Sequence, residues 1–209
     1  MKDTTHPQNN QEQLLPEITV HGRFQPPIHV NHWRYIKRGF NRARHVTLLI
    51  TNPFQDEAYD AAASWRNDPT NNPFTYEERV QMFESLFTNL GIPASRYTIK
   101  PFNIKDPASF KELDPAVPNL VNVYSEWSAK KVALFAEHGL KVVRLEMPKT
   151  IPVSGTVLRE IINTPHETDE TLSQELLEAG LLEEALPGLL EVIQAKRDSQ
   201  EIADGKLSQ

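Results

Sequence analysis

The chain has 209 residues, 39% of them hydrophobic, and 22 Lys and Arg against 28 Asp and Glu give it a formal net charge of -6. This length suits one α/β domain with its own hydrophobic core. The acidic balance argues against general nucleic-acid binding, and the absence of Cys excludes disulfides and thiolate metal sites. No run approaches the roughly 18 apolar residues of a membrane span, so a cytoplasmic protein without a membrane partner is expected.

The first part of the chain is predicted to hold two strands and one helix. Residues 1–16 are polar and rich in Gln, Asn and Thr, which predicts a disordered leader. An apolar run over 18–21 predicts a strand, and an apolar stripe at helical spacing predicts a helix over 30–40. The continuous apolar run over 45–51 predicts a buried strand.

The next elements follow a long polar connection over 52–73, a length typical of segments with a function or with mobility. Thr75 and Glu78 form a capping box that starts a helix, and Gly91 ends it. The rest of the chain predicts strands over 96–102, 120–124 and 141–147, helices over 107–113, 128–138 and from a Ser154 cap to 163, and then two Leu-rich helices split near Pro187 and Gly188.

This order predicts an α/β fold with a parallel, doubly wound sheet of about five strands and C-terminal helices, because strands and helices alternate about five times. We expect a core over residues 17–165, a C-terminal helical element over 166–197 and a polar tail over 198–209. The two Leu-rich helices are predicted to form a cap or the face of a homo-oligomer. Ligands of such sheets bind outside the carboxyl ends of the strands.

One motif, over residues 22–32, begins where the first predicted strand ends and the first helix starts. Backbone N–H groups and the helix dipole favour an anion at such a junction. Residues 21–45 carry six Lys and Arg and no acidic residue, which indicates a local site for a small polyanion. His29 and His32 share one helix face. Two alternatives are a zinc site with a third ligand from elsewhere and two histidines that face solvent.

A second motif follows the last predicted strand. Ser154 supplies a cap hydroxyl, Gly155 allows close approach, Thr156 adds a hydroxyl, and Arg159 lies one turn later. These groups suit the β- and γ-phosphates of a nucleotide. The alternative is an ordinary Ser-capped helix with a surface arginine.

Together the motifs favour transfer of a nucleoside monophosphate to an acceptor that is itself a phosphate. Such an acceptor is already ionised, with a second pKa of about 6, so it needs no general base. The enzyme has to hold two anions together and to neutralise charge on the leaving oxygen. Imidazole N–H groups, an arginine, helix N-termini and Mg²⁺ are suited to that task.

The first motif resembles the GxFxPxHxGH signature of the nucleotidylyltransferase superfamily, and the second resembles its SxTxxR signature. Within this superfamily the sequence more closely resembles the archaeal-type nicotinamide-mononucleotide (NMN) adenylyltransferases. Residues 72–79, the Val123-Tyr124-Ser125 segment and residues 186–193 carry further likeness, in order, between about 18 and 197.

The resemblance implies a Rossmann-like fold, a nucleoside triphosphate (ATP or CTP) that carries Mg²⁺, no resident metal, and release of pyrophosphate. By position it implies three groups of site residues. Catalysis would fall to His29, His32 and Arg159, nucleotide binding to Gly22, Arg23, Phe24, Gln25, Asn31, Ser154, Gly155 and Thr156, and acceptor binding to Arg79, Phe110, Tyr124 and Trp127.

The sequence also departs from the family pattern. Asn31 replaces the signature glycine between the histidines, and the spacing from Gly22 to His29 is one residue longer, as if Ile28 were inserted. Glu126 and Trp127 stand where the family has a Gly-Asn pair associated with nicotinamide recognition. The resemblance makes adenylyl transfer to NMN the first expectation. The departures suit a different acceptor or CTP, so cytidylyl transfer to a small phosphate or phosphonate is the second expectation and a non-catalytic nucleotide sensor is the third.

Overall fold

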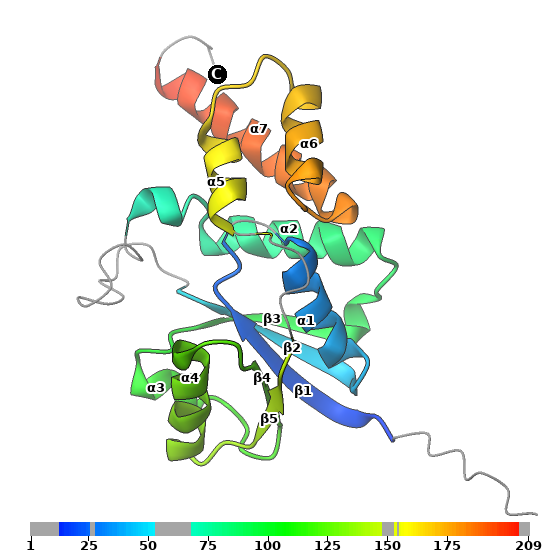
Figure 1. Cartoon of the computed structure of the whole chain (residues 1–209), viewed down its shortest axis with the longest axis vertical. Coiled ribbons are helices and arrows are strands. Elements are labelled where there is room, and N and C mark those ends of the chain that lie inside the picture. The colour runs from blue at the N-terminus through cyan, green and yellow to red at the C-terminus, as the bar shows by residue number, and fades with distance from the viewer. Residues whose placement is uncertain (1–12, 26–27, 53–67, 148–152, 154, 205–209) are drawn as a thin grey trace, which may run out of the picture.

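The computed structural model describes residues 13–25, 28–52, 68–147, 153 and 155–204 (Figure 1). Strands and helices alternate through the first two thirds of the chain, and helices follow. The strands are β1 (Leu15–Gly22), β2 (Ala43–Thr51), β3 (Tyr97–Phe102), β4 (Asn119–Asn122) and β5 (Val142–Leu145). The helices are α1 (Val30–Phe40), α2 (Tyr76–Asn89), α3 (Pro107–Lys111), α4 (Glu126–Glu137), α5 (Gly155–Asn163), α6 (Asp169–Glu178) and α7 (Leu186–Ala203), with short 3-10 turns at Pro69–Asn71, Ala94–Arg96 and Glu183–Ala185.

These strands form one parallel sheet in the order β3-β2-β1-β4-β5. Val20 of β1 pairs with Leu48 of β2 on one side and with Leu120 of β4 on the other. The strand order reverses between β1 and β4, which is the point where sheets of this kind bind ligands. The predicted five-stranded Rossmann-like fold is confirmed.

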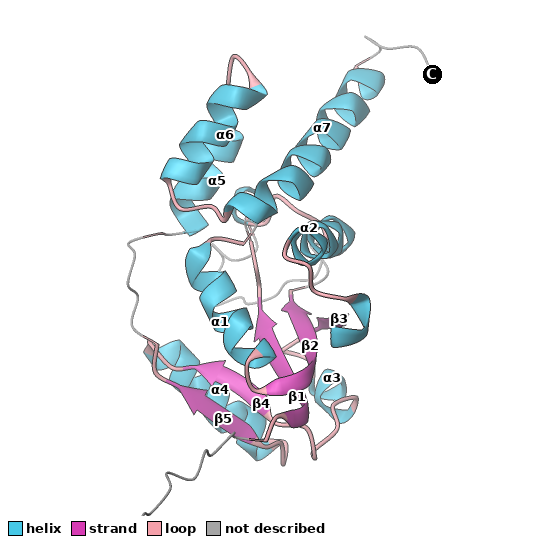
Figure 2. Ribbon diagram, turned by 90° about the vertical axis from the view of Figure 1, so that its right-hand side faces the viewer, coloured by secondary structure: helices cyan, strands magenta, loops and turns pink. Residues whose placement is uncertain are grey.

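Helices cover both faces of the sheet, because alternate residues of each strand point to opposite sides. Leu48 belongs to the larger core, which includes α1 and α2, whereas Leu49 belongs to a smaller core with Phe110 of α3 and Phe135 of α4. Figure 2 shows α1 and α4 on opposite sides of the strands.

The C-terminal helices gather at one end of the molecule, beside α2 (Figures 1 and 2). A Cβ added at Gly188 of α7 would lie 2.6 Å from the Cβ of Ser85 in α2, so this glycine allows the two helices to touch. No described helix is long and apolar enough to span a membrane.

The predicted break between the last helices at Pro187 and Gly188 is wrong. Both residues lie in the first turn of α7, where proline is tolerated because its missing N–H would have no partner within the helix. The chain turns earlier, after α6, where Gly180 has a φ of +91°. Two other boundaries also differ: β1 starts at Leu15, inside the expected leader, and α7 continues to Ala203, beyond the expected helical element.

Candidate active site

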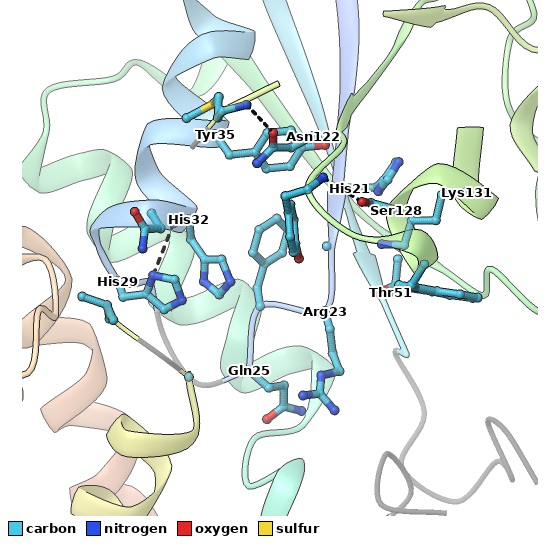
Figure 3. A pocket seen from close by; sticks show the side chains of 18 of the residues that line it. His21, Arg23, Gln25, His29, His32, Tyr35, Thr51, Asn122, Ser128 and Lys131 are labelled. Atoms are coloured by element: carbon cyan, nitrogen blue, oxygen red, sulfur yellow. Dashed lines mark hydrogen bonds between the residues drawn. The ribbon is translucent and has the colours of Figure 1, made fainter. Parts of the chain in front are cut away.

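A pocket of about 480 Å³ opens at the carboxyl ends of the central strands. Gly22, Thr51 and Asn122, the last residues of β1, β2 and β4, all contribute to its wall. Side chains from α1 and α4 also line the pocket (Figure 3), and Thr156 and Arg159 of α5 complete the wall. This volume is in the range of small-molecule sites.

The segment after β1 has an unusual backbone and tight packing. Phe24 has a φ of +50°, a region that residues other than glycine rarely adopt. Its ring stands edge-on to His32, with ring centroids 5.3 Å apart. A Cβ added at Gly22 would lie 2.6 Å from Cζ of the same ring, so a glycine is required beneath Phe24.

Gln25 fixes this segment to the start of α2. Its Nε2 donates to the carbonyl oxygen of Phe74 (2.7 Å), and the backbone N–H of Phe74 donates to its Oε1 (3.1 Å). The backbone carbonyl of Gln25 accepts a 3.1 Å hydrogen bond from Nη1 of Arg159, and Nη2 of Arg159 donates to the hydroxyl of Thr156 (3.1 Å). The two sequence motifs therefore meet at one arginine, which is 6% exposed.

His29 and His32 stack face to face, with ring centroids 3.8 Å apart. Nδ1 of His29 accepts the backbone N–H of His32 at 3.4 Å, so the proton of the neutral His29 ring is assigned to Nε2. Burial holds the pKa of His32 well below its usual range, and the nearby His29 and Arg23 side chains lower it further. At neutral pH the ring of His32 is therefore uncharged and supplies one N–H donor.

A third histidine, His21, lies in the pocket wall on the α4 side of the sheet. It is 4% exposed and stacks on Phe135, with ring centroids 4.8 Å apart. Neither of its ring nitrogens has a hydrogen-bond partner among the described residues. Burial lowers its pKa to about 3, and the charge of Lys131 adds to this effect.

The described pocket wall carries cationic side chains and no acidic ones. Arg23, Lys131 and Arg159 all line it, and the described lining includes neither Asp nor Glu. The described residues also contain no group of three or more His, Asp or Glu side chains that would hold a metal ion. Such a wall suits a polyanion whose own oxygen atoms would carry most of the coordination of a divalent cation.

The chain matches no known protein-family model. It is 33% identical over 156 residues to phosphonoformate cytidylyltransferase of Streptomyces viridochromogenes, an alignment that covers 72% of this chain and 83% of that protein. The chain belongs to the nucleotidylyltransferase superfamily.

Solved structures agree with this assignment at the level of the fold. A bifunctional NMN adenylyltransferase/ADP ribose pyrophosphatase from Francisella tularensis superposes on this nucleotidylyltransferase with a TM-score of 0.51 and 18% identity, over 90% of the chain. A second structure of that protein, in complex with AMP and a Mn ion, superposes equally well. The chain spans just over half the length of these structures, 57% and 56%.

Most of the predicted site residues of this nucleotidylyltransferase come together in the pocket. Ser154 lies outside the described residues. The predicted residues that line the pocket are Gly22, Arg23, Phe24, Gln25, His29, Asn31, His32, Tyr124, Trp127, Gly155, Thr156 and Arg159.

Two predicted acceptor-binding residues lie elsewhere. Arg79 is 1% exposed, and its guanidinium donates to the carbonyl oxygens of Arg23, Thr51, Asn52 and Thr75. It therefore joins the first motif to the end of β2 rather than facing the pocket. Phe110 is in the smaller core, in an edge-on contact with Phe102 and stacked on His138. Their placement does not agree with a role in acceptor binding.

Three lining residues with polar or charged side chains, His21 of β1, Asn122 of β4 and Lys131 of α4, were not predicted from the sequence. His21 immediately precedes the first motif, Asn122 ends β4, and Lys131 lies in the second turn of α4. Ligands of such sheets bind at the carboxyl ends of the central strands, so the predicted strand ends could have pointed to His21 and Asn122. Lys131 carries no local signal, because a lysine in a helix is most often exposed.

Proposed function

We propose that this nucleotidylyltransferase transfers a cytidylyl group from CTP to a small phosphonate or phosphate acceptor. One oxygen of the acceptor attacks the α-phosphorus of CTP and forms a new P–O bond. The bond from the α-phosphorus to the oxygen that bridges it to the β-phosphorus breaks. The electron pair of that bond leaves with pyrophosphate.

The observation that carries this proposal is the joining of the two motifs by Arg159 around one positively charged pocket. This pocket can hold the triphosphate and the acceptor together, and such holding supplies most of the catalysis in phosphoryl-type transfer. CTP is favoured because the 33% identical relative is named a phosphonoformate cytidylyltransferase and the alignment covers most of it.

The residues of α1 and α5 suit the triphosphate. His29 and His32 would donate imidazole N–H groups to the phosphate oxygens and to the charge that grows on the leaving oxygen. Arg159 and Thr156 would hold the departing phosphates at the N-terminal part of α5. Mg²⁺ would enter with the nucleotide and neutralise the triphosphate, with its oxygens as the main ligands.

Adenylyl transfer to NMN, the first expectation from the sequence, has weaker support. The solved structures with that activity in their names are 18% identical, a level that concerns the fold alone. NMN carries a cationic pyridinium ring, and the acceptor end of the pocket already holds a cation. The side chain of Lys131 lies 5.9 Å from the ring of Trp127. Two positive groups at that end would repel each other.

The test is pyrophosphate release, measured with each of four nucleoside triphosphates against phosphonoformate, methylphosphonate and NMN, with Mg²⁺ present. Release that requires both CTP and phosphonoformate supports the proposal, and omission of the acceptor gives the background hydrolysis. Release only with ATP and NMN would overturn it in favour of adenylyl transfer. Nucleotide binding without release from any pair would indicate a sensor.

A further inference from the structure

We propose that His21 and Lys131 form a subsite for a second acid group on the acceptor, the group that does not attack the nucleotide. This inference rests on the proposed nucleotidyl transfer and names the acceptor class: a small acid that carries a carboxylate or a similar anion next to its phosphonate or phosphate. Neither residue belongs to the two sequence motifs.

His21 gives the first reason. A buried polar group that lacks a hydrogen bond costs about 1–3 kcal/mol, so native proteins rarely contain one without a cause. Both ring nitrogens of His21 are in this state within the described part of the chain, although the ring is packed flat on Phe135. Because the ring lines the pocket, a ligand there would supply the partner that the protein does not.

The presence of Lys131 in the same wall indicates the charge of that ligand. The lysine lies in the same wall, and its charge acts directly on the His21 ring. An ammonium group and an imidazole N–H together match the oxygens of a carboxylate. Because the described lining contributes no Asp or Glu, the negative charge at this point is expected to come from the ligand.

The position of the pair fits an acceptor rather than the triphosphate. His29 and His32 lie on the α1 side of the pocket, whereas Lys131 and Ser128 lie on α4, and His21 projects from β1 toward the α4 side (Figure 3). The attacking oxygen of the acceptor has to point toward the triphosphate held by α1 and α5. Its other end then points toward α4.

Trp127 adds a constraint on the shape of that acceptor. Lys105 Nζ lies 5.5 Å from its ring centroid and Lys131 Nζ lies 5.9 Å from it. The indole is therefore already in contact with two ammonium groups, a favourable arrangement that a stacked cationic ring would have to displace. A compact diacid can reach Lys131 without that displacement.

The experiment compares two acceptors, phosphonoformate and methylphosphonate, which differ in the second acid group. Wild type is expected to have a higher kcat/KM with phosphonoformate. In Lys131→Met and His21→Phe the KM for phosphonoformate should rise about 10-fold or more, the equivalent of one charge-assisted hydrogen bond. The KM for CTP should stay within about twofold, because the triphosphate is bound elsewhere.

Two controls separate binding from a structural effect. Lys130→Met changes the neighbouring lysine, which pairs with Glu126 at 2.8 Å on the exposed side of α4 and is outside the pocket wall; it should leave the preference between the acceptors intact. Lys131→Arg keeps the charge and should recover most of the preference. A purely structural role would lower activity with both acceptors equally.

The outcomes distinguish this inference from the proposed function. If wild type is active with CTP and phosphonoformate but Lys131→Met keeps the full preference, the subsite is wrong and the function stands. If wild type releases no pyrophosphate with any pair, the subsite is tested instead by calorimetric measurement of phosphonoformate binding. Binding to wild type and loss of binding in Lys131→Met would support the subsite, and no binding to wild type would overturn it. If His21→Phe does not fold, the Lys131→Met variant alone is sufficient for this test.

Discussion

The guanidinium of Arg159 donates a 3.1 Å hydrogen bond to the backbone carbonyl of Gln25, which lies 134 positions earlier in the chain. The same side chain binds the hydroxyl of Thr156. The loop after β1 and the first turn of α5 are therefore held in one arrangement before any nucleotide enters. Such preorganisation removes part of the ordering cost of binding and of reaching the transition state.

The substitution Arg159→Lys tests this link. A lysine at this position would keep the charge but lose the planar fork that reaches both Gln25 and Thr156. We expect kcat/KM to fall by about 100-fold, the scale of losing one transition-state donor. Steady-state pyrophosphate release with CTP and phosphonoformate measures it. Arg144→Lys, an exposed position of β5, is the control and should have wild-type kinetics; an equal loss in both variants would contradict the assignment.

His32→Ala is expected to lower kcat by about 100-fold or more, because the imidazole would no longer stabilise charge on the leaving oxygen. The KM for CTP should change less than kcat if the contact forms mainly in the transition state. The control is His138→Ala, an exposed histidine at the end of α4 outside the pocket wall. Unchanged turnover in His32→Ala would remove this residue from the mechanism.

Arg79→Met should act on stability rather than on acceptor affinity. The change removes donors from buried backbone carbonyls, including those of Arg23, Thr51 and Asn52. We expect the free energy of unfolding to fall by about 3 kcal/mol, as for other groups left buried without partners. Denaturant unfolding measures it, with Arg38→Met, an exposed position of α1, as the matched control. A raised acceptor KM with unchanged stability would restore the acceptor-binding role.

The pKa of His21 predicts an acid-dependent loss of stability. The folded state holds this pKa at about 3, whereas an unfolded chain has the ordinary 6.5, so the unfolded state binds more protons between these values. The free energy of unfolding therefore falls as the pH drops through this window. From pH 7 to pH 5 the expected contribution is about 2 kcal/mol.

The comparison that isolates this effect is His21→Phe against wild type, with denaturant unfolding at both pH values. The variant should lose about 2 kcal/mol less on acidification, since phenylalanine does not titrate. The contribution of His32, whose pKa is also lowered, stays the same in both proteins. Identical acid sensitivity in the two proteins would show that the buried imidazole of His21 is not the source.

Much of the fold follows from local patterns. The helix predicted over 30–40 coincides with α1, because its apolar stripe matches the face that packs on the sheet. The capping box of Thr75 and Glu78 is present, with both hydrogen bonds. The error at Pro187 arose because proline stops a helix only in its interior, and the sequence alone does not show where the first turn lies.

The site could be predicted only in part, for a similar reason. Motif residues carry a spacing signal, and twelve of the fifteen predicted residues line the pocket. Arginine and phenylalanine are common in binding sites, so Arg79 and Phe110 were plausible candidates. In the folded chain, however, Arg79 binds backbone carbonyls and Phe110 is buried in the smaller core. His21 and Lys131 line the same wall because β1 and α4 pack against each other, with His21 stacked on Phe135, and no local sequence pattern predicts that packing.

The walls of the pocket come from different parts of the chain, with Thr156 and Arg159 on α5 and Lys131 on α4. A shortened protein that stopped after β5 would keep every strand but lose Thr156 and Arg159, and with them one side of the nucleotide cradle. Changes on α4, by contrast, leave that cradle untouched. On the proposed function, substitutions on α4 can therefore change which small acid is accepted, while Thr156 and Arg159 stay as they are.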